Sequence, residues 1–355
     1  MQSRILLAAL TLAATLPVAP GPVFADTIQL TIISAQPPRM RSVGLLRDFF
    51  VPEVDKRLAA MGGKHRIKWT QGYAGSIAKG PEVLEAVQKG IADIAQVGIL
   101  FEGAKLPLQQ MTWYAPFHHG TLQTVVDVAQ KLNDTMPELS AAYAKYNQVM
   151  LTAIGTDNYQ LVTTFPVRSV DDIKGRKIGT PGTASNWLRG TGAVNVSAEL
   201  INYYNSLKTG VFEGIIVFGS GIVPFKFYEV APYITKVDFG PQNSTAITMN
   251  KRKWNRLPED VRTVLKDVAN EYRTRVAGVQ EASGRRALSI TAKRGAKVYT
   301  LPADERAKWA NKMPNIAREW ADRLEKKGLP AHKILNAYME ALRGAGARPL
   351  RDWDK

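Results

Sequence analysis

The chain contains no cysteine among its 355 residues. Disulfide-stapled scaffolds, thiolate nucleophiles and cysteine metal ligands are therefore excluded. Hydrophobic residues make up 45% of the chain, which is enough to bury a full core. At this length we expect one large domain or two of ordinary size, stabilised by apolar burial instead of cross-links.

A long hydrophobic run is missing as well. The apolar stretch Ile5–Leu16 has about 12 residues, whereas a membrane-spanning helix needs roughly 20. Arg4 precedes this stretch, Pro17–Pro22 breaks it, and Val23-Phe24-Ala25 places small or apolar residues before Asp26. The pattern is typical of a secretory signal peptide, not of a membrane anchor, and predicts cleavage after Ala25. Export without any cysteine favours a bacterial periplasmic protein over a eukaryotic secreted one.

Catalytic signatures are also absent. The sequence has four histidines but no HExxH, GxSxG or GxxxxGK[ST] motif. Gly190 and Gly192 form a GxG pair after a helix, whereas a dinucleotide site needs it after a strand. Asp171-Asp172 follows Ser169 and is better explained by the positive end of a turn than by a carboxylate pair for acid–base catalysis. We therefore expect a protein that is not an enzyme and that holds no cofactor or metal.

The positive charge is large but dispersed. The formal net charge is +16, yet no basic run is longer than Lys251-Arg252-Lys253. Aromatic residues do not interleave with the basic ones, as they do in nucleic-acid-binding motifs. We interpret the charge as a solvated basic surface that attracts anionic solutes or a membrane partner, with no role in nucleic-acid binding.

The first part of the chain alternates between strand and helix patterns. Extended segments are expected at 27–34, 65–69, 91–98 and 149–155, and helices at 43–61, 81–90 and 127–146, with Pro52 and Pro137 interrupting the first and the last of these. A Gly-rich loop, 72–80, precedes the second helix. Strand and helix in alternation favour a parallel sheet with crossover helices. We assign 26–155 to a first α/β lobe.

A second α/β lobe is predicted for 156–238. Its expected strands and helices are 160–164, 176–178, 184–189, 193–196, 200–209 and 212–217. Return strands (239–257), a long helix (258–292) and a C-terminal helical segment (293–355) that frays from Arg343 follow. Because strands join the lobes instead of a flexible linker, we predict a hinge with a ligand between the lobes.

Five ordered blocks of the sequence resemble the DctP-type extracytoplasmic solute receptors of TRAP transporters. The blocks are PEVLEAVQKGIADIAQV (81–97), VRSVDDIKGRKIGTPG (167–182), GAVNVSAELINYYNSLKTGVFEG (192–214), FKFYEVAPYIT (225–235) and MNKRKWNRLPEDVR (249–262). The resemblance implies a periplasmic-binding-protein fold (type II-like) with two α/β lobes and a long helix spanning both. It also implies a receptor that closes around a small organic acid and delivers it to the small and large membrane subunits of a TRAP permease.

The sequence departs from this family where the resemblance implies polar ligand contacts. The position at which an arginine clamps the ligand carboxylate is Gly179, the asparagine after "DG" corresponds to Val217, and a second basic position aligns near Tyr159. A buried carboxylate without a cationic partner costs several kcal/mol. Either another arginine takes over, with Arg39, Arg176 and Arg189 as candidates, or the ligand is not a simple C4-dicarboxylate. We favour the second alternative, with an aromatic, amphipathic, neutral or cationic solute.

The candidate ligand-binding residues lie at strand ends and in loops, where open α/β units bind ligands. They are Gln36, Tyr73, Gln96, Asp157, Tyr159, Gly179, Thr180, Trp187, Tyr203 and Phe218. The alternative for aromatic residues such as Tyr204 is a place in the core or in a loop-fixing contact. An Asp157 that faced the ligand would favour a cationic or hydroxylated solute.

Two other classes of protein are compatible with these features of the sequence. A receptor for an ABC transporter or a sensor kinase has the same two lobes. A periplasmic enzyme on the same scaffold is a more distant alternative, since a catalytic triad need not be contiguous in sequence.

Overall fold

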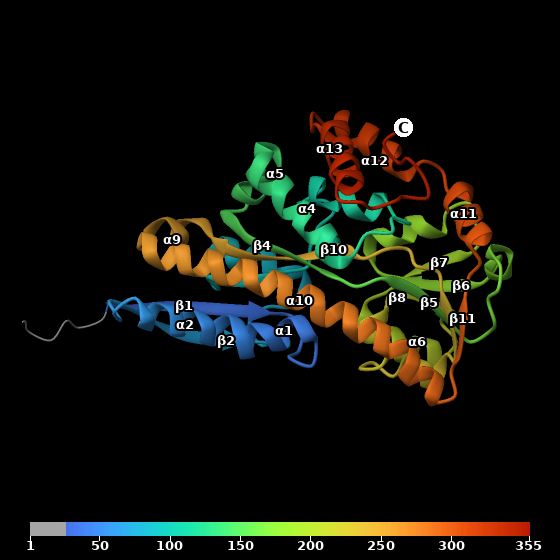
Figure 1. Ribbon diagram of the computed structural model, residues 1–355, viewed down its shortest axis with the longest axis horizontal. Helices are drawn as coiled ribbons and strands as arrows, with labels where there is room; N and C mark the ends of the chain where they lie inside the picture. Colours follow the sequence, from blue (N-terminus) through green and yellow to red (C-terminus); the bar gives the residue numbers. More distant parts are fainter. Residues whose placement is uncertain (1–25) are drawn as a thin grey trace, which may run out of the picture.

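The computed structural model describes residues 26–355 and shows two α/β lobes side by side (Figure 1). The predicted signal peptide, 1–25, lies outside the described residues. Within the described part of the chain, no helix combines the length and apolarity needed to cross a membrane.

The first lobe is built on a five-stranded mixed sheet in the order β2-β1-β3-β10-β4. Its strands are β1 (Asp26–Ser34), β2 (His65–Gly72), β3 (Ile94–Val97), β4 (Gln148–Thr156) and β10 (Gln242–Asn250). As predicted, β1 runs parallel to β2 and β3. The return strand β10 enters antiparallel between β3 and β4, which makes the sheet mixed.

Five helices between β1 and β4 flank this sheet, and Pro137 marks where one of them begins. They are α1 (Arg41–Leu45), α2 (Val51–Ala60), α3 (Val83–Lys89), α4 (Leu122–Thr135) and α5 (Pro137–Lys145). Pro137 occupies a first-turn position, where the missing N–H costs no hydrogen bond. Pro52 instead follows a π-helical turn, Leu46–Phe50, that joins α1 to α2 without a break. The Thr121 hydroxyl caps α4 by accepting from the Thr124 amide, so this helix starts earlier than predicted.

The second lobe is built on a six-stranded sheet in the order β11-β9-β5-β8-β6-β7. Its strands are β5 (Tyr159–Thr163), β6 (Lys177–Thr180), β7 (Val194–Ser197), β8 (Gly214–Phe218), β9 (Tyr233–Lys236) and β11 (Lys297–Thr300), and its short helices are α6 (Tyr203–Lys208), α7 (Gly219–Ile222) and α8 (Phe227–Val230). Strand β11 corrects our expectation that 293–355 is purely helical. All four of its residues are exposed, so this strand does not need the alternation of apolar and polar residues that reveals a half-buried strand in a sequence.

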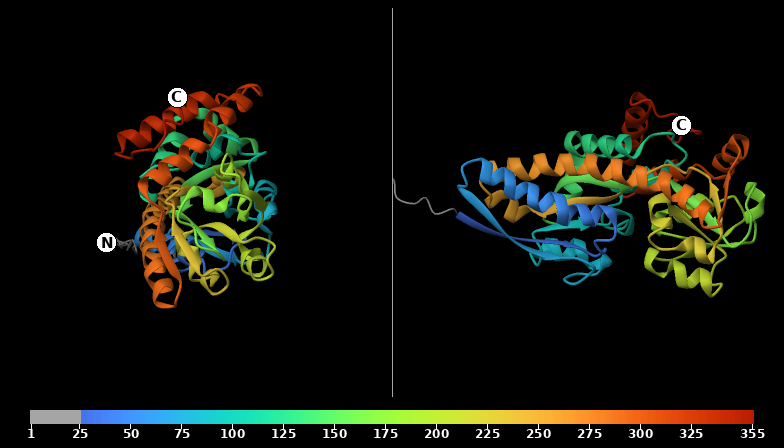
Figure 2. Two further views of the ribbon diagram at one scale, coloured as in Figure 1. Left: turned by 90° about the vertical axis from the view of Figure 1, so that its right-hand side faces the viewer. Right: turned by 60° about the horizontal axis from the view of Figure 1, so that its bottom comes forward.

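One long helix connects the lobes. After the short helix α9 (Lys251–Arg256), α10 (Glu259–Lys293) runs for 35 residues. It packs on β4 and α4 of the first lobe and on α7 and β11 of the second. The predicted helix spanning both lobes is therefore confirmed (Figures 1 and 2).

The C-terminal helices cover the junction from one side. They are α11 (Ala303–Lys312), α12 (Ile316–Glu325) and α13 (Ala331–Gly344), drawn in red at the top of Figure 1. The tail beyond α13 does not fray as predicted. Trp353 is fully buried and its indole nitrogen donates to the Pro116 carbonyl at 2.7 Å, while Arg343 pairs with Asp354.

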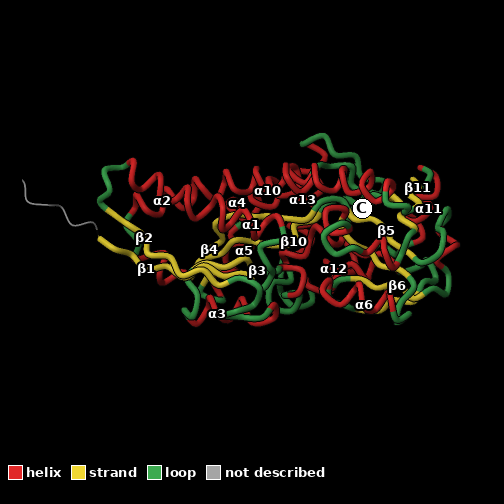
Figure 3. Tube along the Cα trace, turned by 90° about the horizontal axis from the view of Figure 1, so that it is seen from below, coloured by secondary structure: helices red, strands yellow, loops and turns green. Residues whose placement is uncertain are grey.

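Two clusters of buried side chains form the core. One lies between the first sheet and α2 and α10, with Leu30 and Ile32 of β1 and Tyr272 of α10 among its members. The other includes Ile33 on the opposite face of β1 and continues into the second lobe as far as Trp309. Figure 3 shows both sheets lying alongside α10. Because the second cluster is continuous, the two lobes are packed against each other.

Candidate functional site

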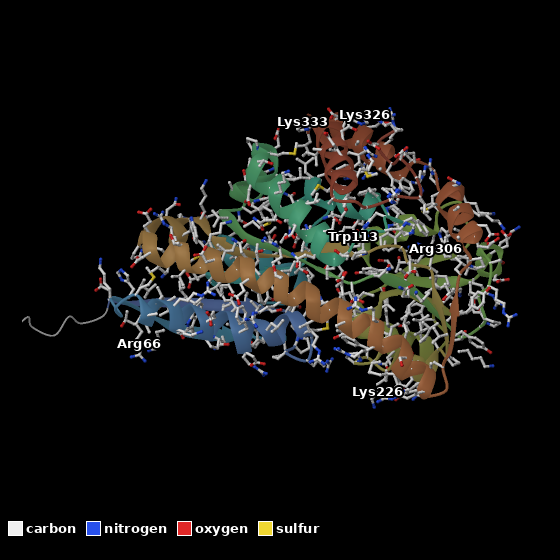
Figure 4. All side chains as sticks on the ribbon, in the orientation of Figure 1. Arg66, Trp113, Lys226, Arg306, Lys326 and Lys333 are labelled. Atoms are coloured by element: carbon white, nitrogen blue, oxygen red, sulfur yellow. The ribbon has the colours of Figure 1, made fainter. Side chains whose placement is uncertain are left out.

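Aromatic rings gather where the two lobes meet. We call Trp113, Tyr159, Trp187, Phe218 and Phe239 the junction cluster. Trp113 lies in a 3-10 turn of the first lobe, Leu108–Tyr114. Tyr159, Trp187 and Phe218 belong to the second lobe, and Phe239 lies in the connection that returns from β9 to β10. Trp113 lies near the centre of the molecule (Figure 4). Strand pairing explains one contact, because Tyr159 begins β5 directly opposite Phe218 at the end of β8.

The rings of the junction cluster contact one another at favourable distances. Trp113 stacks on Trp187 with centroids 5.5 Å apart, and Trp187 stacks on Phe239 at 5.1 Å. Tyr159 meets Trp113, Trp187 and Phe218 edge to face at 5.5, 5.5 and 5.8 Å. Offset stacks and edge-to-face pairs at such separations each contribute about 0.5–1.5 kcal/mol beyond area burial. The structure thus brings together three predicted site residues, Tyr159, Trp187 and Phe218.

The polar atoms of this cluster differ in their hydrogen bonding. The Trp187 indole nitrogen donates to the Trp113 carbonyl at 2.8 Å. The Tyr159 hydroxyl lies 2.9 Å from the Thr156 hydroxyl. Burial raises the pKa of Tyr159 above its ordinary value, so the phenol stays neutral. The Trp113 indole nitrogen has no hydrogen-bond partner among the described residues.

The space beside Gly179 is filled by the protein itself. A Cβ placed on Gly179 would lie 2.9 to 3.1 Å from atoms of the Phe212 ring. We expected this glycine to leave room for a ring of the solute; in the structure the neighbouring ring is that of Phe212. Phe212 in turn packs edge to face on Tyr203, with centroids 5.7 Å apart. Tyr203 is 1% exposed and its hydroxyl has no partner among the described residues.

Thr180, which follows Gly179, and Val217, which precedes Phe218, both contact other residues of the protein. The Thr180 hydroxyl donates to the Asn195 amide oxygen at 2.5 Å, toward the edge strand β7. Val217 is 1% exposed and belongs to the core cluster shared by the lobes.

The predicted residues of the first lobe lie apart from the junction cluster. The Gln96 amide donates to the Ser42 hydroxyl at 3.1 Å and accepts from Ser34 at 3.3 Å. Gln36 has a buried amide oxygen without a partner among the described residues. Tyr73 packs against the core between the first sheet and α10 and donates to Gln71 at 2.8 Å. Tyr73 therefore belongs structurally to the first lobe alone.

Asp157 faces α10 instead of the aromatic rings. Its carboxylate accepts from the Ser220 amide and hydroxyl, at the start of α7. A Cβ on Gly284 of α10 would lie 2.0 Å from Asp157 Oδ2, so glycine is required there for close approach. Burial raises the pKa of Asp157 to about 7, against the opposing effect of the Ser220 hydrogen bonds. Asp157, predicted to face the ligand, thus lies in a strand connection between the lobes, in contact with α7 and α10.

The strand connections between the lobes contain further polar contacts. The side chains of Asn158 and Gln160 both donate to Asp238, at 2.9 and 2.8 Å, which ties the two strand connections together. The Gln280 amide of α10 donates to the Gly155 carbonyl at 2.6 Å. A cavity of about 460 Å³ borders this region and is lined in part by Asp157 and Asp238. None of the junction cluster lines that cavity.

The three arginines considered as replacement clamps lie elsewhere. Arg176 pairs with Glu213 at 2.6 Å and covers a phenylalanine ring, and Arg189 pairs with Glu319 at 2.6 Å. Arg39 alone of the three reaches across the lobes, with its guanidinium carbon 5.3 Å from the centroid of Phe225. Its side chain is exposed. Four basic residues labelled in Figure 4 are likewise exposed, as expected for a solvated basic surface: Arg66, Lys226, Lys326 and Lys333.

Sequence reasoning missed Trp113, Phe212 and Phe239. Trp113 lies in a segment, LPLQQMTWYAPF, whose apolar residues follow neither helical nor strand periodicity. Phe212 was assigned to a strand, but β8 begins two residues later. Among the described residues, no group of three or more His, Cys, Asp or Glu side chains is arranged to hold a metal ion.

Two α/β lobes, two crossing strand connections, a shared long helix and a buried cluster between the lobes define a bilobal binding protein. The chain belongs to the family of bacterial extracellular solute-binding proteins, family 7 (DctP), whose model matches residues 53–323. The predicted family and fold are confirmed.

Curated relatives are similar to the chain in sequence, and solved structures share its fold. The C4-dicarboxylate-binding periplasmic protein DctP of Rhodobacter capsulatus is 28% identical over 175 residues, which is 48% of this chain. The chain spans about half the length of the first curated relatives that it matches, namely 52%, 50% and 49%. A Bordetella pertussis extracytoplasmic solute receptor binding pyroglutamic acid has a TM-score of 0.73 at 22% identity, covering 89% of this chain and 99% of that one. A TRAP solute-binding protein of Rhodoferax ferrireducens with copurified benzoate has a TM-score of 0.78 at 18% identity, covering 90% and 98%.

Proposed function

We propose that this chain is the periplasmic solute receptor of a TRAP transporter, that it captures an aromatic organic acid between its lobes, and that it catalyses no reaction. Closure of the lobes would carry the solute to the small and large membrane subunits of a permease. The predicted signal peptide, cleaved after Ala25, would deliver the chain to the periplasm.

The observation that supports an aromatic solute is the junction cluster. The rings lie between the lobes, and the position that carries the clamping arginine in the family resemblance is a glycine packed against Phe212. Apolar walls with a few polar atoms are the usual lining of small-molecule sites. A C4-dicarboxylate would bury two charges there without a guanidinium, at a cost of several kcal/mol. An aromatic ring offsets that cost by stacking.

A thermal-shift screen of the mature protein tests this proposal. Benzoate and pyroglutamate represent ring-bearing acids, succinate represents C4-dicarboxylates, and amines and polyols complete the panel. We expect the largest rise in Tm with benzoate, because a ligand that binds only the folded state stabilises it by mass action. The largest shift with succinate would contradict the aromatic assignment, and turnover of any solute would favour an enzyme. A receptor for an ABC transporter or a sensor kinase gives the same shifts, so co-purification with each class of membrane partner separates these alternatives.

Restoring the arginine tests the role of Gly179. We expect Gly179→Arg to abolish benzoate binding, because its Cβ would lie 2.9 Å from the Phe212 ring and its side chain would enter the aromatic site. The double variant Gly179→Arg, Phe212→Ala frees that space and serves as the folding control. Calorimetry should then show a gain of succinate binding in the double variant. Unchanged benzoate affinity in a folded Gly179→Arg variant would show that this position does not border the solute.

A further inference from the structure

Among the buried hydrogen-bond donors that have no acceptor within residues 26–355, two belong to aromatic side chains near the proposed site. They are the indole N–H of Trp113, a residue that is fully buried, and the hydroxyl of Tyr203, which is 1% exposed. A buried donor left unpaired costs about 1–3 kcal/mol, and the great majority of such groups in folded proteins are satisfied. Each of these two donors therefore calls for a partner that the polypeptide does not supply.

Each unpaired donor has a neighbour of the same chemistry that is paired. Trp187 stacks on Trp113, and its N–H donates to the Trp113 carbonyl at 2.8 Å. The Tyr159 hydroxyl is bonded to Thr156, whereas Tyr203 packs between Phe212 and Phe227 with its hydroxyl free of protein acceptors. The crowded aromatic surroundings alone do not explain the missing partners, because Trp187 and Tyr159 find theirs in the same environment.

The two unpaired donors lie beside the two features that support an aromatic solute. Trp113 contacts Tyr159 of the junction cluster edge to face at 5.5 Å, and Tyr203 packs on Phe212, the ring beside Gly179. With its pKa raised, Tyr203 stays a neutral donor. One donor thus comes from the first lobe, at the junction cluster, and the other from α6 of the second lobe, next to the ring that packs on Gly179.

We infer that the Trp113 N–H and the Tyr203 O–H donate to the oxygen acceptors of the bound solute, an aromatic carboxylic acid whose ring lies against the junction cluster. This inference rests on the proposed function and adds the residues that determine its specificity. Two neutral donors take the place of one guanidinium. Hydrogen bonds to a carboxylate are charge-assisted and stronger than those between neutral groups, so they offset part of the cost of burying the anion.

Four conservative variants, each removing one donor, test the assignment. Trp113→Phe and Tyr203→Phe remove the unpaired donors; Trp187→Phe and Tyr159→Phe remove the paired ones. The two tryptophan variants share a similar loss of ring area, so the difference between them isolates the N–H group. Calorimetric titration with benzoate gives the affinity, and thermal unfolding without solute gives the Tm.

We expect Trp113→Phe and Tyr203→Phe each to weaken benzoate binding by at least tenfold. Without solute, Trp113→Phe should lower the Tm less than Trp187→Phe does. Tyr203→Phe should leave the Tm unchanged or raise it, whereas Tyr159→Phe should lower it. A merely structural role of Trp113 or Tyr203 would give the opposite pattern, with a lower Tm and an unchanged affinity.

The outcomes separate this inference from the proposed function. Wild-type benzoate affinity in both Trp113→Phe and Tyr203→Phe would overturn the donor assignment and leave the receptor function intact. Tm losses equal to those of the paired variants would also overturn it, because the donors would then have partners such as buried water within the free protein. A wild-type protein that binds no acid of the panel would contradict the proposed function and the donor assignment together, whereas binding of succinate alone would contradict the aromatic solute and the donor assignment and leave the receptor function intact.

Discussion

Both sides of the lobe junction contain buried residues, but one side is aromatic and the other is polar. On one side aromatic rings surround donors without acceptors, as at Trp113. On the other side Asp157 accepts from Ser220, and Gln280 of α10 donates to the Gly155 carbonyl. The carboxylate and amide groups named on the polar side are paired within the chain, whereas the Trp113 N–H on the aromatic side is not.

We expect this difference to distinguish a hinge, on the polar side, from the proposed recognition site, on the aromatic side. A polar network whose hydrogen bonds are made within the chain has one preferred geometry, and we expect it to fix how the lobes join. Unpaired donors among rings stabilise nothing until an acceptor arrives, so they suit a site that is completed by its ligand. Variants on the polar side should therefore affect stability, and variants on the aromatic side should affect binding.

The largest effect is expected at the contact between α10 and Asp157. Gly284→Ala would place a Cβ 2.0 Å from Asp157 Oδ2, so the helix or the carboxylate must move. We expect a loss of about 3 kcal/mol in the free energy of unfolding, because overpacking and the broken Ser220 contacts add together. Urea denaturation measures this loss.

Gly278→Ala is the matched control on the same helix. Nothing lies within 4 Å of a Cβ at Gly278, so the helix propensity of alanine should raise the unfolding free energy by up to about 1 kcal/mol. Equal effects of the two substitutions would show that the close approach at Gly284 does not constrain the hinge.

A smaller effect, dependent on pH, is expected at Asp157 itself. Its pKa is raised to about 7 in the folded protein from 3.8, the ordinary value. Between these values the unfolded chain loses the proton and the folded chain keeps it, so stability should fall as the pH rises from about 4 to about 7 and level off above that. Asp157→Asn removes the ionisable group and keeps an acceptor for Ser220. We expect the variant to be more stable than the wild type by roughly 2 kcal/mol at pH 8 and nearly equal at pH 4.

Chemical denaturation across this pH range provides the measurement. Glu281 raises the Asp157 pKa through its charge, as a minor effect after burial. Glu281→Gln therefore serves as a comparison that should shift the decline slightly toward lower pH without removing it. A wild-type stability that rises between pH 4 and 7 as steeply as that of Asp157→Asn would contradict the assignment.

Much of the fold is visible in the sequence because its main signals are local. The hydrophobic strand 27–34, the first-turn Pro137 and the uninterrupted helical stretch after Pro258 each specify their element with little help from distant residues. Strand β11 and the anchored tail escape such reasoning, since they depend on pairing with β9 and on the contact of Trp353 with Pro116.

The site is less predictable than the fold because side-chain direction decides it. The sequence placed Tyr159, Trp187 and Phe218 at strand ends or turns near the junction, and the structure brings them into contact. Asp157 lies only two residues before Tyr159, yet it points to α10 because Gly284 leaves space there. Trp113 contacts Tyr159 across more than forty residues of chain, and no periodic pattern in the sequence reveals that contact.

The smallest effect is expected at the exposed contact between Arg39 and Phe225. Arg39 of the first lobe lies over Phe225 of the second, and an exposed cation–π contact of this kind contributes about 0.5–1 kcal/mol. Arg39→Gln should weaken the closed arrangement only, so benzoate should dissociate two to five times faster, as measured by stopped-flow. Arg168→Gln is the control, because Arg168 lies over Tyr299 within the second lobe, 5.9 Å from its centroid. If both variants accelerated dissociation alike, general charge would be responsible; an effect of Arg39→Gln alone would show that the contact between Arg39 and Phe225 holds the lobes closed around the solute.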